Sequence, residues 1–593
     1  MYYLVSFIQY IMQGRQVHMQ LNMEQRKLIQ AKPVGHNLIK GVAGSGKTTV
    51  ALHKTLFLRN HYCFGENERI LLVTYNRTLI NYIKYLYEKI EDEHKDLYIN
   101  IFDDNENKVD IQTIDKIIYD YYMKTEESKK YKIDFDKNNR YSLLTHCITE
   151  ISKKYPKVKI MDQKNLMFLL DEIDWIKSCN YMELEEYQHA DRLGRMSYQS
   201  TDGGPQKLMK NSDTRRAIFE LMVLFDKKFR ENNIISMKDA ALTALKYAWN
   251  NVEKTYNHII VDESQDLTRV QLEFLKLLSC SKDTSSITFI ADTAQSIYAH
   301  SWLVKGRSFA SIGFDMTGKS SSLNKNYRTT TQIAQAAFSL IEKDENIIDD
   351  ENFVKPYLID KQGSYPVYKH FKRVQEESSH INYLIEQLLE KGYAYKDMAI
   401  ISRNHNQLKS IQEEFDQNSK PWVFISKRKP DFELDGIKMM TMHSIKGLEF
   451  KVVFIVGINK EILPFVSYLE KEEQSLQESQ ERKLLYVGMT RATELLFLSS
   501  CNKPSKFIKD IEPAYLKLTM DSRIKSFYDV KLDNYLYQDK IFDLFSEEEK
   551  IRQWLLKELI DNYRYPKELI DVECKVNEFS RIGFVDIVVY SGK

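Results

Sequence analysis

The stretch Gly41-Val42-Ala43-Gly44-Ser45-Gly46-Lys47-Thr48 decides the fold of this chain. It follows a short apolar run at residues 36–40 and leads into a helical pattern that starts at Thr49 and continues to residue 58. A strand, a glycine-rich loop and a helix in this order form a phosphate-binding loop, because the glycines let backbone N–H groups face phosphate oxygens and the helix adds its dipole. The sequence therefore predicts a nucleotide site at residues 41–49, in which Lys47 neutralises phosphate charge and Thr48 binds Mg²⁺.

Two carboxylates at the end of a second apolar run complete the predicted site. Residues 257–261 have the pattern of a buried strand, and Asp262 and Glu263 follow directly. Asp262 is expected to be the carboxylate partner of Mg²⁺, and Glu263 is placed to polarise an attacking water. Together with the phosphate-binding loop, this run predicts hydrolysis of ATP in the presence of Mg²⁺.

The composition limits the number of domains and the class of protein, but it does not identify a binding partner. The chain has 593 residues, which predicts about three to five domains. Lys and Arg number 85 against 84 Asp and Glu, so net charge gives no argument for a nucleic-acid partner. Six scattered cysteines without a C-x-x-C pair speak against a disulfide framework or a zinc ribbon, and we expect a reducing cytoplasm. The apolar run at residues 2–12 is read as neither a signal peptide nor a membrane anchor.

The pattern of apolar residues predicts an α/β protein with a helical insertion. Short apolar runs alternate with helical stretches at residues 22–77, 258–298 and 365–500, as in parallel α/β folds. Residues 116–249 instead show long helical periodicity with many charges and few strand-like runs.

Eight segments follow one another along the chain: residues 21–25 (LNMEQ), 74–77 (TYNR), 112–115 (QTID), 262–266 (DESQD), 295–298 (QSIY), 326–329 (NYRT), 441–450 (TMHSIKGLEF) and 481–492 (ERKLLYVGMTRA). In their residues and their order they resemble the UvrD/Rep/PcrA group of superfamily 1A DNA helicases. The resemblance covers roughly residues 21–500. It implies two RecA-like P-loop domains with ATP bound between them.

The resemblance also implies roles for individual residues of the nucleotide site. Gln25 and Tyr327 are expected to hold the adenine edge and face, and Gln295 to lie near the γ-phosphate. Arg328 and Arg491, both expected from the second domain, would stabilise transition-state charge when the cleft closes. Glu449 is expected to contact the nucleotide or to link it to DNA.

A path for single-stranded DNA across the tops of both domains follows from the same resemblance. The aromatic candidates are Tyr75, Tyr298 and Trp302, and the polar candidates are Thr74, Asn76, Thr113, Thr441 and His443. His300 stands where tryptophan is common in the group, and Asp115 where histidine is common. The stacking step size is therefore left open.

The expected domain organisation lacks one unit of the family. The expected parts are an N-terminal extension (1–20), a first RecA-like domain 1A (21–310) with a helical insertion 1B at about 116–249, a second RecA-like domain 2A (311–505), a linker (506–545) and a small α+β C-terminal segment (546–593). UvrD-like helicases usually carry a long helical subdomain, 2B, before the 441–450 segment. Here only residues 404–436 are available, which is too short for it.

The C-terminal segment contains the pattern E-E-x-x-R (548–552), Y-P (565–566), V-E (572–573) and D-I-V-V-Y (586–590). In this pattern it resembles the start of the nuclease-like domain of type I restriction-enzyme R subunits, a PD-(D/E)xK fold. A capping box at residues 546–549 is expected to open a helix with an apolar face at Ile551, Trp554, Leu555 and Leu559. Glu548 or Glu549 and Asp586 would then contribute to a Mg²⁺ site whose E-x-K is not in the sequence. A fragment of a longer protein, an inactive remnant and a plain helix-and-hairpin appendage remain alternatives.

These features predict an ATP-dependent DNA helicase or translocase of the UvrD type that moves on single-stranded DNA, 3′-to-5′ by family analogy, in DNA repair, recombination or defence. The expected partners are single-stranded DNA, duplex junctions and a nuclease or repair protein, with no membrane. The alternatives are an ATP-gated DNA-binding or recruitment module with little unwinding, and the motor arm of a nuclease system.

Overall fold

The protein is described from a computed structural model, and the description covers most of the chain. The described residues are 21–75, 77–95, 108–192, 208–251, 255–298, 300–304, 306–358, 361–425, 435–465, 471–518, 536–537, 547–578 and 581–591. The expected N-terminal extension (1–20), Asn76, Ser546 and most of the expected linker lie outside these residues.

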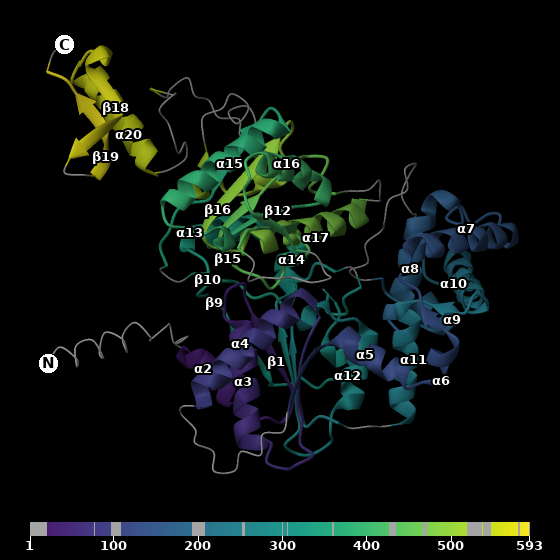
Figure 1. The fold of residues 1–593 in the computed structure, drawn as a ribbon. Coiled ribbons are helices and arrows are strands. Elements are labelled where there is room, and N and C mark those ends of the chain that lie inside the picture. Colours follow the sequence, from purple (N-terminus) through teal and green to yellow (C-terminus); the bar gives the residue numbers. More distant parts are fainter. Residues whose placement is uncertain are drawn as a thin grey trace, which may run out of the picture.

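The first unit, which contains β1 in Figure 1, is built on a six-stranded parallel sheet. Its strand order is β3-β2-β6-β7-β1-β8. Its strands are β1 (Gly35–Gly41), β2 (Ile70–Thr74), β3 (Val109–Thr113), β6 (His258–Asp262), β7 (Ser286–Ala291) and β8 (Ser320–Leu323). Because all strands run the same way, Gly41, Asp262 and Ala291 end at one edge of the sheet. The loops that carry the predicted chemistry therefore start side by side.

Helices cover both faces of this sheet. One face packs against α2 (Met23–Gln30), α3 (Lys47–Tyr62) and α4 (Arg77–Lys95), and the other against α5 (Ile114–Met123) and α12 (Arg269–Leu278). Along β6, Ile260 packs on the first side whereas Ile259 and Val261 pack on the second. Successive strand residues point to opposite faces, so a sheet buried on both sides requires the unbroken apolar run seen in the sequence.

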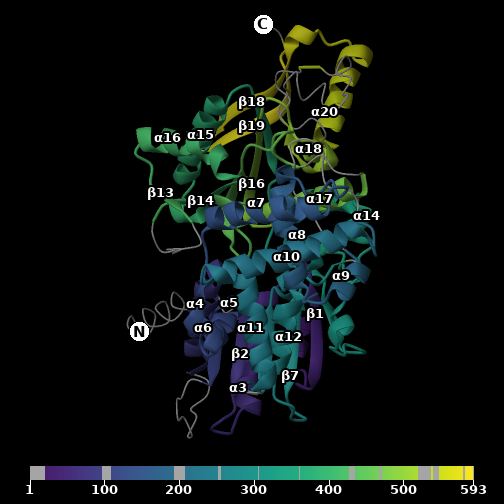
Figure 2. The same ribbon diagram turned by 90° about the vertical axis from the view of Figure 1, so that its right-hand side faces the viewer.

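A helical insertion lies between β3 and β6, as the sequence pattern predicted, and stands beside the first sheet (Figures 1 and 2). Beyond α5 it contains α6 (Glu126–Lys130), α7 (Lys137–Lys154), α8 (Leu166–Ser178), α9 (Leu184–His189), α10 (Asp213–Glu231) and α11 (Met237–Asn250), with a short parallel pair β4 (Lys132–Ile133) and β5 (Ile234–Ile235). Its apolar residues belong to the same core cluster as one face of the sheet. The insertion is therefore packed onto the first domain through a shared core.

The second unit is a seven-stranded parallel sheet in the order β13-β14-β12-β15-β16-β11-β17. Its strands are β11 (Val367–Phe371), β12 (Met398–Ser402), β13 (Trp422–Phe424), β14 (Ile437–Thr441), β15 (Phe450–Ile455), β16 (Ala492–Cys501) and β17 (Lys517–Leu518). The helices α13 (Thr331–Glu342) and α17 (Lys471–Met489) pack on one face, and α15 (Val374–Glu390) and α16 (Lys409–Gln417) on the other. The smaller elements are α14 (Glu345–Ile348), α18 (Lys506–Asp510) and a parallel pair β9 (Lys325–Asn326) and β10 (Tyr357–Leu358).

Two boundaries differ from those expected from the sequence. β8 pairs with β1 from Leu38–Ser320 to Gly41–Leu323, so the first sheet extends beyond residue 310. β17 pairs with β11, so the second sheet extends beyond residue 505 into the expected linker. Both strands escaped the sequence analysis because β8 is the polar run SSSL and β17 is only two residues long.

The C-terminal segment folds into α20 (Glu547–Lys557) and an antiparallel hairpin of β18 (Ile570–Glu578) and β19 (Arg581–Val589), drawn in yellow in Figure 1. Its small core contains Leu556, Ile570 and Val572. Of the expected apolar face, Leu559 packs against this core, whereas Ile551 and Trp554 are each 62% exposed and Leu555 is 39% exposed. No helix among the described residues is long and apolar enough to span a membrane.

Candidate functional site

The phosphate-binding loop has the backbone geometry that its sequence predicts. Gly44 and Gly46 have φ angles of +76° and +80°, in the left-handed region that favours glycine. A Cβ at Gly44 would lie 2.1 Å from Asn326 Oδ1, and one at Gly46 would lie 2.5 Å from Gln25 Nε2. Gly46 is the N-cap of α3 and offers no side-chain cap, so the first N–H groups of the helix face the loop. This arrangement fits an anionic phosphate group.

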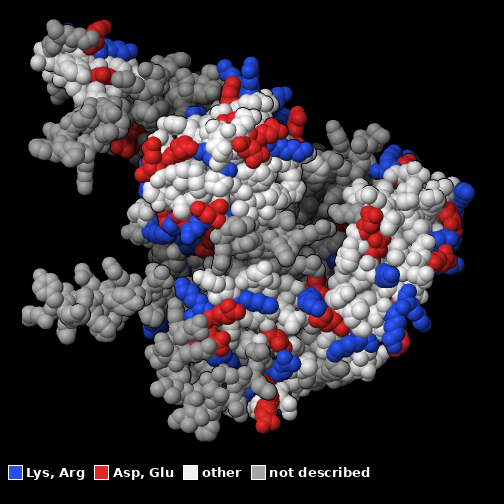
Figure 3. All heavy atoms as spheres, viewed as in Figure 1, with Lys and Arg blue, Asp and Glu red and all other residues white. Residues whose placement is uncertain are grey.

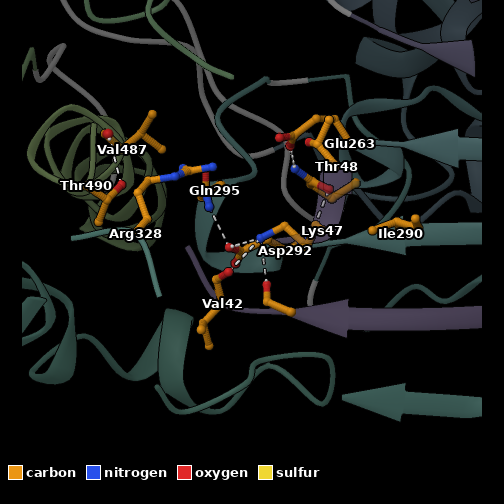
Figure 4. Close-up of polar contacts among 12 residues, drawn as sticks. Val42, Lys47, Thr48, Glu263, Ile290, Asp292, Gln295, Arg328, Val487 and Thr490 are labelled. Carbon is orange, nitrogen blue, oxygen red and sulfur yellow. Dashed lines mark hydrogen bonds and ion pairs between the residues drawn. The ribbon is translucent and has the colours of Figure 1, made fainter. Parts of the chain in front are cut away.

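Lys47 is held inside this loop by three acceptors (Figure 4). Its ammonium group donates to the carbonyls of Gly41 at 3.0 Å and Val42 at 2.8 Å, and to Asp292 Oδ2 at 3.0 Å. Gln295 Nε2 donates to the same Asp292 oxygen at 2.6 Å. Asp292, which follows β7, therefore links two predicted catalytic residues, although the sequence analysis gave it no role.

The two expected carboxylates lie where β6 ends. Thr48 Oγ1 donates to Asp262 Oδ2 at 2.9 Å, so the two expected Mg²⁺ ligands are adjacent. Hydroxyl and carboxylate oxygens are ligands that Mg²⁺ accepts, and the donor set fits this ion. Burial, and then the neighbouring Glu263, raises the pKa of Asp262.

Glu263 combines an unusual backbone with a strongly cationic environment. Its φ of +53° is left-handed, which is uncommon for a residue with a side chain and is found at functional sites. Burial opposes its ionisation, but Lys446, and then Lys47 and Arg491, hold the pKa of Glu263 below its usual range. Gln265 donates a hydrogen bond to the carboxylate. The group is thus kept ionised and able to accept a hydrogen bond from water.

A cavity of about 310 Å³ opens beside the loop and collects the residues expected to hold the nucleotide. It is lined by Leu21, Asn22, Gln25, Gly44, Gly46, Thr48, Thr49, Leu86, Tyr327, Arg328, Gly447 and Glu449. Gln25 Nε2 donates to Ser45 O at 3.0 Å, whereas Tyr327 is 38% exposed and offers a ring face. Among the described residues, the buried Ser45 hydroxyl has no hydrogen-bond partner. The cavity therefore presents an aromatic face, an amide edge and a phosphate cradle together, which fits a purine nucleotide.

The two predicted arginines have different attachments. The Tyr327 N–H donates to Gly44 O at 2.9 Å, and Arg328 forms an ion pair with Glu449. Arg328 therefore follows β8 and stays tied to the phosphate-binding loop, rather than belonging to the second domain alone as the sequence analysis expected. Arg491, two residues beyond the end of α17, is 1% exposed, and burial lowers its pKa to about 10.

Three cations of the second domain meet one short segment of the first, the 3₁₀ turn η3 (Thr293–Gln295). Arg491 donates to the side-chain oxygen of Gln295, Lys446 donates to its carbonyl, and Lys483 Nζ donates to Thr293 O at 2.9 Å. Lys446 also lies 2.6 Å from Asp266 Oδ2 and 3.5 Å from Glu263 Oε2. Lys446 and Lys483 lie within two of the motif segments, but their roles could not be predicted, since contacts across domains leave no spacing signal.

The expected DNA contacts are only partly assembled. The rings of Tyr75 and Tyr298 lie 4.9 Å apart, and the Lys446 ammonium lies 5.8 Å from the Tyr298 ring. Thr74 and Thr113, which end β2 and β3, are buried. Thr441 ends β14 and His443 follows in the same loop, both half-buried. Tyr75 and Tyr298 thus form one aromatic pair beside the loops that carry the polar candidates.

Trp302 is a correction to the predicted DNA path. It is 5% exposed, its indole N–H donates to Ser308 O at 3.2 Å, and the Arg307 guanidinium covers its ring at 4.5 Å. A base needs an open ring face for stacking, which Trp302 does not offer. The neighbouring His300 instead contacts Asp171 Oδ1 of α8 at 2.9 Å, which ties this loop to the helical insertion.

The candidate carboxylates of the C-terminal segment do not form a metal centre. Glu549 is buried and paired with Arg552, and Gln553 donates to it at 2.8 Å. Asp586 lies exposed on β19. Within the described residues, no group of three or more His, Cys, Asp or Glu side chains is placed to hold a metal.

The fold and the site together define a P-loop protein with two RecA-like domains and a nucleotide cleft. Residues 21–302 match the model of the UvrD/REP helicase N-terminal domain, and residues 321–433 and 425–503 match that of the UvrD-like helicase C-terminal domain. The chain belongs to the UvrD-like DNA helicases. Residues 547–593 match the model of the type I restriction enzyme R protein N terminus, which confirms the resemblance seen in the sequence.

Two curated relatives and one solved structure are similar to parts of this chain. A "Probable DNA helicase" of Mycoplasma pneumoniae is 23% identical over 518 residues, which cover 84% of this chain and 88% of the relative. The "ATP-dependent DNA helicase PcrA" of Staphylococcus epidermidis is 30% identical over 168 residues, but these cover only 23% of each chain. The C-terminal domain of a possible DNA helicase from a Lactobacillus strain aligns with 33% of this chain and 99% of that chain, at 17% identity and a TM-score of 0.25.

Proposed function

We propose that this chain hydrolyses ATP to move along single-stranded DNA in the 3′-to-5′ direction, with Mg²⁺ held by Thr48 and Asp262. Membership of the UvrD-like helicases supports ATP and DNA as ligands. The direction rests on the family resemblance. The place of action we propose is the cytoplasm, in DNA repair, recombination or defence.

The observation that carries this proposal is the meeting of second-domain cations at η3. This turn holds Gln295 on the nucleotide side, and the chain continues from it to Tyr298 on the proposed DNA side. Lys446 and Arg491 contact the turn from the second domain. Closure of the cleft would therefore change the position of this turn, and with it the contacts to both the nucleotide and the DNA. A motor needs such a coupling between hydrolysis and DNA binding.

The side chains divide the chemistry of hydrolysis among them. Lys47 would exchange its carbonyl and Asp292 partners for phosphate oxygens, and Glu263 would orient and deprotonate the attacking water. Mg²⁺, when bound, neutralises phosphate charge. Arg328 and Arg491 would stabilise the charge that develops on the transferring phosphoryl group, and Arg491 would do so only in the closed cleft.

An ATP-gated DNA-binding or recruitment module is a second candidate. The stretch between β12 and β14, where the family usually carries subdomain 2B, is short, and its described part forms α16 and β13 of the second sheet. We propose that 2B is absent, which favours translocation over unwinding by the single chain. The match at residues 547–593 favours a third role, as the motor arm of a nuclease system.

The deciding experiment measures ATPase rate with and without single-stranded DNA, together with strand separation on tailed duplexes of both polarities. We expect hydrolysis that DNA stimulates and that Lys47→Ala abolishes. Lys40→Ala is the matched control, because this lysine at the end of β1 bonds to Glu351 O instead of the loop. The motor proposal would be contradicted if the ATPase rate did not depend on DNA, or if hydrolysis persisted in Lys47→Ala. Stimulated hydrolysis without strand separation would leave a translocase.

A further inference from the structure

One stretch of the helical insertion departs sharply from the charge balance of the chain. Residues 153–164 contain one acidic residue, Asp162, and five lysines: Lys153, Lys154, Lys157, Lys159 and Lys164. All five lysines are exposed. On the face drawn in Figure 3, Lys and Arg are interspersed with Asp and Glu, and the whole chain has a net charge of only +1. We call residues 153–164 the lysine turn.

Helix stability explains only part of this concentration of charge. Lys153 and Lys154 lie in the last turn of α7, where cations offset the helix dipole. Lys154 also pairs with Glu220 at 2.5 Å. Lys157, Lys159 and Lys164 lie beyond the helix, and within the described chain their ammonium groups have no acidic or hydrogen-bonding partner. Within the described residues, four lysines of the turn therefore lack an acidic partner that neutralises their charge: Lys153, Lys157, Lys159 and Lys164.

The backbone of the turn is fixed, so these charges are held in place. Tyr155 N–H donates to Ile151 O, Val158 N–H to Tyr155 O and Met161 N–H to Val158 O, each at 3.0 Å. The side chains of Ile160 and Met161 are buried in the core that the insertion shares with the first sheet. A rigid turn holds its cations close together at a smaller entropic cost than a flexible loop.

The position of the turn places it near the proposed DNA path. Lys164 lies in the 3₁₀ turn at Gln163–Asn165 that leads into α8, and Asp171 of α8 contacts His300, two residues beyond Tyr298. At 1.5 Å per residue, Asp171 lies about 8 Å along α8 from Leu166, and Lys164 precedes Leu166 by two residues. The turn therefore lies outside the Tyr75–Tyr298 pair, on the side of the insertion.

The side chains of the lysine turn indicate which kind of nucleic acid it can bind. Single-strand sites combine cations with exposed aromatic rings on which bases stack. The only aromatic residue in the turn, Tyr155, is half-buried, and its hydroxyl is bonded to Glu220 at 2.7 Å. Ammonium groups without rings bind the phosphate backbone and carry no base readout. Duplex DNA presents the densest line of phosphates, about one charge per 1.7 Å of helix axis.

We propose that the lysine turn binds the phosphate backbone of the duplex that adjoins the bound single strand. It would hold the junction in a chain that offers few residues for subdomain 2B. This inference rests on the proposed function in one respect, that single-stranded DNA lies at the Tyr75–Tyr298 pair.

The test compares the full chain with a variant in which Lys153, Lys157, Lys159 and Lys164 are changed to Gln. A charge-matched control changes Lys130, Lys132, Lys227 and Lys246, exposed lysines elsewhere on the insertion, to Gln. Affinity is measured from low to high salt for a single-stranded oligonucleotide and for the same oligonucleotide carrying a duplex at either end. Each lost phosphate contact lowers the salt slope for duplex DNA by about 0.9.

We expect the variant to lose about 3 to 4 units of salt slope on one tailed duplex and none on the single strand, while the control keeps both. An unchanged slope on both tailed duplexes would overturn the proposal, and so would an equal loss on the single strand. Stimulation of ATP hydrolysis by single-stranded DNA should persist in the variant. If the wild type itself shows no such stimulation, the motor proposal fails, but the salt slopes still decide whether the turn binds duplex.

Discussion

The ammonium group of Lys446 lies 2.6 Å from the carboxylate of Asp266, and this contact joins the second RecA-like domain to the first. Burial raises the pKa of Asp266 to about 7, although Lys446 opposes the shift. The same lysine approaches Glu263 on the nucleotide side and the Tyr298 ring on the other. Lys446 is therefore well placed to couple the binding of nucleotide to the binding of single-stranded DNA.

Replacing Lys446 by Met should uncouple hydrolysis from DNA. The variant keeps Lys47, Thr48 and Asp262, so we expect nucleotide binding to persist while the stimulation by single-stranded DNA falls by about tenfold or more. ATPase assays with and without DNA give the ratio. Lys451→Met, which removes an exposed lysine paired with Asp397, is the control. Normal stimulation in Lys446→Met would remove the residue from the coupling path.

Glu263→Gln should bind nucleotide but hydrolyse it at least about 10³-fold more slowly, because the amide cannot accept the proton of the attacking water. Equilibrium binding of a fluorescent nucleotide and steady-state turnover separate the two effects. Glu342→Gln, on the exposed side of α13, should leave both unchanged. Turnover close to wild type in Glu263→Gln would assign the base to another residue.

Arg491→Ala should retain nucleotide binding and lose about 10³-fold or more in turnover. The buried guanidinium contacts Gln295 and the Val487 carbonyl at once, so Arg491→Lys, with one compact charge, should restore little activity. Single-turnover hydrolysis measures the step directly. If Arg491→Lys were as active as the wild type, a fixed fork geometry would not be required there.

Tyr298→Ala should weaken single-strand affinity by about 5- to 150-fold, the equivalent of one lost stacking contact of about 1–3 kcal/mol. Trp302→Phe should instead lower the melting temperature with little change in DNA affinity, since the indole is buried under Arg307. Fluorescence anisotropy and thermal denaturation test the pair. The opposite pattern would return Trp302 to the DNA path and remove Tyr298 from it.

His258 should make the first domain less stable in acid. It is 1% exposed, its Nδ1 lies 3.0 Å from Ser286 Oγ, and burial lowers its pKa to about 4. The unfolded chain binds the proton below about pH 6.5 whereas the native state resists until about pH 4. Stability is therefore lost as pH falls through this window, by on the order of 3 kcal/mol.

Thermal denaturation between pH 4 and pH 8 measures the effect. His258→Asn should flatten the pH dependence of the first melting transition, whereas His146→Asn, on the exposed face of α7, should not. Equal slopes for the wild type and His258→Asn would contradict the prediction.

Local pattern predicted the nucleotide site better than anything else in the chain. The phosphate-binding loop and the carboxylates after β6 were readable, since strand, loop and helix follow each other directly and the backbone does most of the binding. The partners Asp292, Lys446 and Lys483 were not, because each acts through contacts between segments far apart in the sequence. Trp302 was misread for a related reason, since only packing tells a stacking ring from a core ring.

Because Arg328 is attached to the phosphate-binding loop, its distance from Arg491 offers a measure of how far the cleft is open. The hydrogen bond from Tyr327 to Gly44 ties the backbone beside Arg328 to the first sheet, although the Arg328 side chain pairs with Glu449, whereas Arg491 follows α17 of the second domain. We expect the distance between the backbones of these two residues to change when the cleft opens or closes. Spin labels placed beside Arg328 and Arg491 would follow each opening and closing of the cleft as a change in distance, with no label on the DNA.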